Sequence, residues 1–136
     1  MTYTTAQKSL AAHLLCDQFP RLHFGVARAW VTAESGLNNN VFGVTVGGVL
    51  QKYPTMEAGV RAAATRIKTL LIYKAVRDAF NSPHEPGCES YGPHASGQAS
   101  ALCRSPWHSG VSGVKAQGGI DLYYRRIFKT FGYRIA

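Results

Sequence analysis

The stretch AWVTAESGLNNNVFGV, residues 29–44, joins a helical pattern to a strand pattern. A stripe at helical spacing runs through its first part and predicts a helix from about Leu22 to Glu34. The members of that stripe are His23, Val26, Ala27, Trp30, Val31 and Glu34. Gly36 suits the residue after a helix end, and three consecutive asparagines are typical of a turn. We therefore expect a helix whose apolar face ends in a carboxylate.

A small β-hairpin is predicted directly after this turn. Residues Val41 to Val46 read as one strand and Val49 to Tyr53 as the return strand. Gly47 and Gly48 between them form a two-residue hairpin signal. Because the alternation of apolar and polar residues is imperfect, we expect the hairpin to be short and twisted.

Helical patterns surround this segment. A first helix is expected from Ala6 to Phe19, capped by Thr4 or Thr5, with Leu10, His13, Leu14 and Asp17 on one face and Ala11 and Leu15 beside it. A third helix is expected after an N-cap at Thr55, with Glu57 in its first turn. Its apolar stripe changes direction near Leu71, which predicts a break and a separate helix from about Tyr73 to Phe80. Further helices are expected near residues 98–103 and over residues 120–131.

These elements predict one domain, residues 1–136, of the mainly α class (α+β in the loose sense). It would hold five to seven helices and one small β-hairpin after the second helix. A hydrophobic share of 46% with 16% charged residues excludes a disordered chain. No apolar run approaches the length of a membrane span, and no signal peptide is visible at the start.

The net charge of the chain indicates which classes of partner it favours. Fifteen Lys and Arg residues against seven Asp and Glu residues give a net charge of +8. Such a chain favours polyanions, which include nucleic acid, an anionic membrane surface and an acidic cell wall. The charge alone does not choose among them.

Glu34 is the strongest candidate for chemistry. A carboxyl on an apolar face is desolvated, which raises its pKa, and the negative end of the helix dipole acts in the same direction. A carboxyl that stays protonated near neutral pH can serve as a general acid toward a leaving oxygen. The alternative is an exposed helix-end glutamate whose place on the stripe is coincidental.

The residues around Glu34 resemble the catalytic segment of the lysozyme-like superfamily, which includes goose-type lysozymes, soluble lytic transglycosylases and phage endolysin domains. The resemblance rests on AWVTAESG (residues 29–36), NNNVFGV (38–44), YPTMEAGVRA (53–62), YKAV (73–76) and SPW (105–107), in that order. It implies a lysozyme-like fold with a cleft beside the hairpin, and cleavage of peptidoglycan glycan strands with Glu34 as the catalytic acid. The residues it suggests for substrate binding are Ser35, Asn40, Phe42, Thr45, Tyr53 and Trp107.

The sequence is compatible with more than one branch of the lysozyme-like superfamily and with more than one second catalytic group. The glycine-rich stretch usual in transglycosylases is absent, and residues 42–45 stand in its place. A retaining or an inverting glycosidase needs a second carboxylate. Glu57 and Asp121 are available, although each suits a charge near a helix start better. A single-acid mechanism, assisted by substrate or by a water held by Ser35, Thr45 or Tyr53, is the alternative, so hydrolysis and transglycosylation are both compatible with the sequence.

No metal or cofactor is expected. The side chains of Cys88, His94, Cys103 and His108 can bind zinc, but their spacing matches no ligand pair. Pairing of Cys88 with Cys103 is an open alternative. Cys16 lies in an apolar stretch and is expected to be a small buried residue rather than a nucleophile.

The sequence thus predicts a peptidoglycan glycosidase of the endolysin type, made in the host cytoplasm or carried in a virion and acting on the bacterial cell wall. Its expected partner is peptidoglycan, with no nucleic acid and no membrane insertion, and we expect a monomer. Two alternatives are a non-catalytic wall-binding or structural virion module, and a basic helical nucleic-acid-binding protein supported by Arg125, Arg126 and Lys129 beside Tyr123 and Tyr124.

Overall fold

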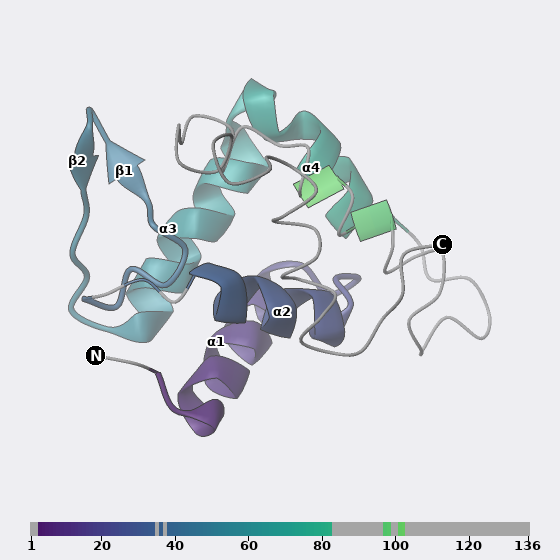
Figure 1. Ribbon diagram of the computed structural model, residues 1–136. Coiled ribbons are helices and arrows are strands. Elements are labelled where there is room, and N and C mark those ends of the chain that lie inside the picture. Colours follow the sequence, from purple (N-terminus) through teal and green to yellow (C-terminus); the bar gives the residue numbers. More distant parts are fainter. Residues whose placement is uncertain (1–2, 35, 37, 83–96, 99–100, 103–136) are drawn as a thin grey trace, which may run out of the picture.

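The computed structural model describes residues 3–34, 36, 38–82, 97–98 and 101–102. This part of the chain is mainly helical, with one two-stranded antiparallel sheet after the second helix (Figure 1). Its elements are α1 (Thr5–Gln18), α2 (Phe24–Glu34), β1 (Thr45–Val46), β2 (Val49–Leu50), α3 (Met56–Thr69), the 3₁₀ helix η1 (Leu71–Tyr73) and α4 (Lys74–Phe80). The predicted class and the place of the hairpin are confirmed.

The helix count differs from the expected five to seven. The described residues hold four α-helices and the short η1, with further helical residues at 97–98 and 101–102. The helix expected over residues 120–131 lies outside the described residues, as do residues 99, 100 and 103 of the one expected near 98–103. The break predicted near Leu71 is confirmed, because α3 ends at Thr69 and the chain turns through η1 before α4 begins.

Local capping explains where two of these helices begin. The Thr4 hydroxyl accepts a hydrogen bond from the Gln7 amide, and the Gln7 side chain accepts one from the Thr4 amide, which completes a capping box on α1. Thr55 caps α3 by accepting from the amide of Ala58. Both N-caps were predicted from the sequence, Thr4 as one of two candidates.

One face of α1 was predicted to hold Leu10, His13, Leu14 and Asp17, with Ala11 and Leu15 beside it. Leu10 is 52% exposed, and His13 and Asp17 are also exposed, whereas Ala11 and Leu15 are buried. The face that packs against α2 and α3 consists instead of Ala11, Ala12 and Leu15. Apolar residues are spread almost evenly around α1, so periodicity did not identify a face. Because alanine side chains are small, α1 can pack closely against α2 and α3 on the face that holds Ala11 and Ala12, and this is the face that is buried.

One apolar core joins α1, α2, α3 and α4. Trp30 is fully buried at its centre, and Phe80 of α4 contacts both Trp30 and Phe19 edge-on, at ring distances of 6.3 and 5.4 Å. Gln98 closes this core from a distant segment. Its side-chain nitrogen donates to the carbonyls of Arg21 and Ala79. Its side-chain oxygen accepts from the His23 amide, which ties the start of α2 to the end of α4.

The hairpin is shorter than predicted. Pairing joins Thr45 to Leu50 and Val46 to Val49, whereas longer strands over 41–46 and 49–53 were expected. Beyond these pairs the Gln51 amide still donates to the Val44 carbonyl at 3.0 Å, and the Asn40 side chain bonds the backbone of both residues. The base of the hairpin is therefore held by one further backbone bond and by the Asn40 side chain.

Candidate functional site

Glu34 is the last residue of α2, and its side chain is half-buried. The apolar stripe predicted to lead to it is confirmed, since Val26, Ala27, Trp30 and Val31 are all buried. His23 lies at the other end of α2, where its ring nitrogen Nδ1 accepts a hydrogen bond from the Gly25 amide in the first helical turn. The helix thus holds Glu34 by a rigid, buried face and delivers its carboxyl to the start of the next loop.

We call Gly36 and residues 38–44 the asparagine loop. It turns back on itself, as the Gly36 amide donates to the carbonyl of Val41 at 3.0 Å. Asn38 and Asn39 both have left-handed backbones, with φ of 56° and 61°. Asparagine tolerates this region better than other residues with side chains. The run of asparagines is therefore explained by the backbone that this loop adopts.

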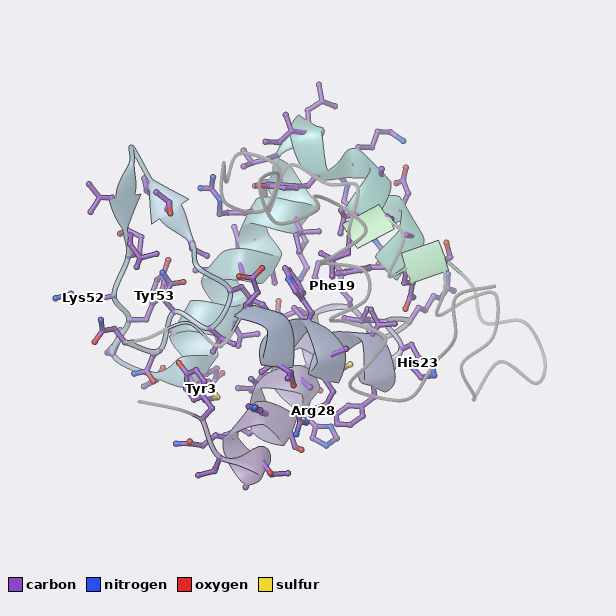
Figure 2. All side chains as sticks on the ribbon, viewed as in Figure 1. Tyr3, Phe19, His23, Arg28, Lys52 and Tyr53 are labelled. Carbon is purple, nitrogen blue, oxygen red and sulfur yellow. The ribbon has the colours of Figure 1, made fainter. Side chains whose placement is uncertain are left out.

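The asparagine loop is bonded to the segment that follows the hairpin. The carbonyl of Asn38 accepts from the Tyr53 amide at 3.0 Å, and the Asn39 side chain donates to the Tyr53 carbonyl at 3.1 Å. In Figure 2, Tyr53 and Tyr3 lie on the same side of the molecule, toward the base of the hairpin. Burial raises the pKa of the Tyr3 phenol, while a hydrogen bond from the Asn39 backbone opposes that rise. The loop is thus enclosed from several directions.

Asn40 is the centre of this network. It is 1% exposed, and its side-chain nitrogen donates to the carbonyls of Val44 and Gln51, both at 2.9 Å. Its side-chain oxygen accepts from the Val44 amide at 2.7 Å. All three bonds are internal, so the structure places Asn40 as a support of the loop rather than at a surface that a ligand reaches.

Phe42 is likewise buried. Its ring packs against Trp30 with the centroids 4.2 Å apart, which fastens the asparagine loop onto α2 one helical turn before Glu34. Thr45 is exposed, and its hydroxyl donates to the Gly43 carbonyl at 3.4 Å. Tyr53 is half-buried against the core. Ser35 and Trp107 lie outside the described residues.

Gly43 faces the Glu34 carboxyl. A methyl carbon built onto Gly43 would lie 3.9 Å from Glu34 Oε2, and the backbone φ of Gly43 is +68°. This φ favours glycine, and the absence of a side chain leaves the approach to the carboxyl uncovered at this position. The structure thus brings Glu34, Gly43 and Thr45 to one region, with Asn40 and Phe42 beneath it.

Two positions hold the loop although the sequence analysis assigned neither of them a role. A methyl carbon on Gly59 of α3 would lie 1.8 Å from the Asn39 carbonyl oxygen, so only glycine fits against the loop there. A glycine inside an otherwise regular helical pattern is the signal that could have identified it. Gln51 is the second, since it accepts the Asn40 bond through its backbone and offers no signal in its side chain.

Two other candidate residues, Glu57 and Cys16, lie within the described ranges. Glu57 is exposed and forms an ion pair with Arg61 at 2.7 Å in the first turn of α3, as expected of a charge at a helix start. Burial, with a smaller effect of Asp17, raises the pKa of the Cys16 thiol to about 11, which suits a structural cysteine. Within the described ranges no three metal-binding side chains come together. Asp121, Cys88, His94, Cys103 and His108 lie outside those ranges.

Comparisons with protein family models, with curated proteins and with solved structures found no match to this chain. The resemblance to lysozyme-like proteins therefore rests on the motifs quoted above, and it stays a prediction.

Proposed function

We propose that this chain is a glycosidase that cleaves the glycan strands of bacterial peptidoglycan, with Glu34 as the general acid. The observation that carries the proposal is the position of Glu34, a half-buried carboxyl at the end of a buried helix face, beside Gly43 at the start of a hairpin. A general acid must hold a proton at a fixed point that a leaving oxygen can reach. A helix end fixes that point, and a glycine opposite it leaves room for a sugar.

In this proposal, the glycan lies in a lysozyme-like groove beside the hairpin, with the exposed Thr45 on its wall. Glu34 donates its proton to the bridging oxygen as the glycosidic bond breaks. Asn40 and Phe42 act as positioning residues, because they hold the loop that faces Glu34. The net charge of +8 favours approach to a wall that carries phosphate and carboxylate groups.

The decisive experiment is the Glu34→Gln variant assayed on purified cell walls by loss of turbidity. Glutamine keeps the shape of the side chain and removes the proton, so we expect activity to fall about 100-fold or more, because general acids contribute at least that much. The matched control is Asp78→Asn, which neutralises an exposed carboxylate paired with Lys74. It should keep wild-type activity, and both variants should melt as the wild type does.

A Glu34→Gln variant that retains most of the wall-cleaving activity ends this proposal. A wild-type chain that sediments with walls without cleaving them favours the non-catalytic wall-binding module instead. Mass spectrometry of the released fragments then identifies the reaction, since reducing ends indicate hydrolysis and 1,6-anhydro ends indicate a transglycosylase. Glu57→Gln tests the second carboxylate, and unchanged activity there favours the single-acid mechanism.

A further inference from the structure

Two turns of the described chain expose aliphatic side chains that contribute nothing to the core. The first is the hairpin tip, residues 46–50, where Val46, Val49 and Leu50 are each more than half exposed. The second is the α3–α4 turn, residues 70–73, where Leu71 is 80% and Ile72 61% exposed. Exposed apolar residues that lie next to one another on a protein surface are candidates for an interaction site.

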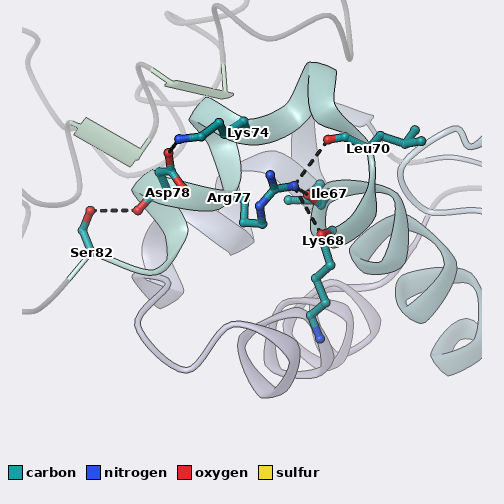
Figure 3. Close-up of polar contacts among 7 residues, drawn as sticks. All are labelled: Ile67, Lys68, Leu70, Lys74, Arg77, Asp78 and Ser82. Atoms are coloured by element: carbon teal, nitrogen blue, oxygen red, sulfur yellow. Dashed lines mark hydrogen bonds and ion pairs between the residues drawn. The ribbon is translucent and has the colours of Figure 1, made fainter.

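These exposed residues are held in place by the fold beneath them. Gly47 and Gly48 close the hairpin with left-handed backbones, and open space surrounds both. Below Leu71 and Ile72, Tyr73 is buried and its amide donates to the Leu70 carbonyl. Arg77 donates to the carbonyls of Ile67, Lys68 and Leu70, which fixes the end of α3 (Figure 3). Both turns are therefore defined projections.

Both turns project on the same side of the molecule. In Figure 1 the hairpin tip and the connection from α3 to α4 form the upper edge of the view, while α1 lies at the opposite edge. A flat surface laid across that upper edge touches both turns at once. The arrangement thus suits a broad partner rather than a partner that fits into one pocket.

The distribution of charged residues along residues 35–77 indicates which kind of partner the two turns would bind. Residues 35–56 and 58–77 contain no acidic residue, and the one between them, Glu57, is paired with Arg61. Lys52 follows the hairpin tip in the sequence and is exposed, and Lys74 follows the α3–α4 turn, where it is exposed and paired with Asp78 at 2.6 Å. Exposed aliphatic side chains on a segment (residues 35–77) with six Lys and Arg residues and one acidic residue match the surface of an anionic lipid bilayer, whose headgroups attract cations while its boundary region takes up apolar groups.

We propose that this chain docks on anionic lipid bilayers through the hairpin tip and the α3–α4 turn. A protein partner would bury a continuous face of about 800 Å² on each side. Two separate convex turns do not form such a face, whereas fluid lipid fills the space between them. The docking is peripheral, and no described helix is both long and apolar enough to cross a membrane. It is independent of Glu34 and of the proposed cleavage.

The test is co-sedimentation of the whole chain with vesicles. We expect binding to vesicles of phosphatidylglycerol mixed with phosphatidylcholine, little binding to phosphatidylcholine alone, and weaker binding in about 1 M salt, where charges are screened within about 3 Å. The double variant Leu71→Ser with Ile72→Ser should bind about tenfold less, because burying one large aliphatic side chain is worth at least that factor. Since both side chains are exposed, the variant should fold normally, which circular dichroism checks.

The matched control is Leu10→Ser, which removes an exposed leucine from α1 at the opposite edge and should leave binding unchanged. Absence of wild-type binding to the anionic vesicles overturns the proposal. Equal binding by the wild type and the double variant overturns it as well. A chain that instead pairs with a second copy through these turns, seen as a dimer by sedimentation velocity that the double variant abolishes, also overturns it.

Discussion

The helical scaffold and the asparagine loop are stabilised in different ways. In α1, α3 and α4, backbone groups bond within each helix, and packing comes from alanines, valines and aromatic rings in one apolar core. The ion pairs of the scaffold, such as Lys74 with Asp78, lie on its exposed surface. In the asparagine loop, side-chain amides form the hydrogen bonds to the backbone that a helix or strand would form internally. Two of its asparagines also adopt left-handed backbone conformations.

This difference predicts different tolerance to substitution. A scaffold helix spreads its stabilisation over many weak contacts, so one altered surface residue changes little. The loop concentrates its stabilisation in a few backbone approaches and buried hydrogen bonds, which one substitution can remove. The loop that faces Glu34 should therefore be the most easily damaged part of the described fold.

The strongest test of this contrast is Gly59→Ala, where the scaffold and the loop touch. The new methyl carbon would lie 1.8 Å from the Asn39 carbonyl oxygen, so the backbone of the loop or of α3 must move. Alanine favours a helix by roughly 0.5–1 kcal/mol over glycine, yet we expect a net loss of about 3 kcal/mol in the free energy of unfolding. Urea denaturation measures it.

Gly48→Asn is the matched control for that glycine. Its position has open space around it and a φ of +79°, which asparagine tolerates. The unfolding free energy should change by less than about 0.5 kcal/mol. A Gly59→Ala variant as stable as Gly48→Asn would mean that α3 and the loop do not approach as closely as described.

A second, smaller effect is expected from Asn40→Ala. The substitution leaves the Val44 amide and the carbonyls of Val44 and Gln51 without their side-chain partner. Because water can reach part of this site once the side chain is gone, we expect a loss of about 2 kcal/mol rather than the full sum of three bonds. Thermal unfolding measures the loss, with Gln51→Ala as the control, since that side chain bonds only the nearby Val49 carbonyl at the surface.

The helices could largely be predicted from sequence because they follow simple periodic patterns. The stripe of α2, the N-cap at Thr55 and the break near Leu71 were all visible as spacing or capping signals. The buried face of α1 was not, because its apolar residues are distributed almost evenly around the helix. Which face is buried there depends on neighbours far away in the sequence.

The candidate site was predictable only at its centre. Glu34 ends a regular stripe, so its place could be predicted. The roles of Asn40 and Phe42 depend on partners that no local pattern reveals, namely the backbone of Val44 and Gln51 and the ring of Trp30. Asn40 and Phe42, which the resemblance suggests for substrate binding, are buried and make contacts within the loop and with α2.

The finest test compares two neighbouring cations within the scaffold, Arg77 and Lys74 (Figure 3). Arg77 donates to three carbonyls at the end of α3, at 2.8, 3.2 and 3.3 Å, and the third of these carbonyls, that of Leu70, also accepts from the Tyr73 amide. Lys74 forms only an exposed ion pair with Asp78. We expect Arg77→Ala to lower the unfolding free energy by about 1 kcal/mol and Lys74→Ala by no more than about 0.5 kcal/mol.

Salt separates the two mechanisms further. The Lys74 effect should vanish in about 1 M salt, because an exposed ion pair is screened. The Arg77 effect should persist, since its hydrogen bonds to carbonyls depend on geometry as well as charge. If both substitutions cost the same and both effects disappear in salt, then Arg77 acts as a surface charge and the end of α3 is held by packing alone. In that case, the scaffold would contain no counterpart of the polar network that holds the asparagine loop.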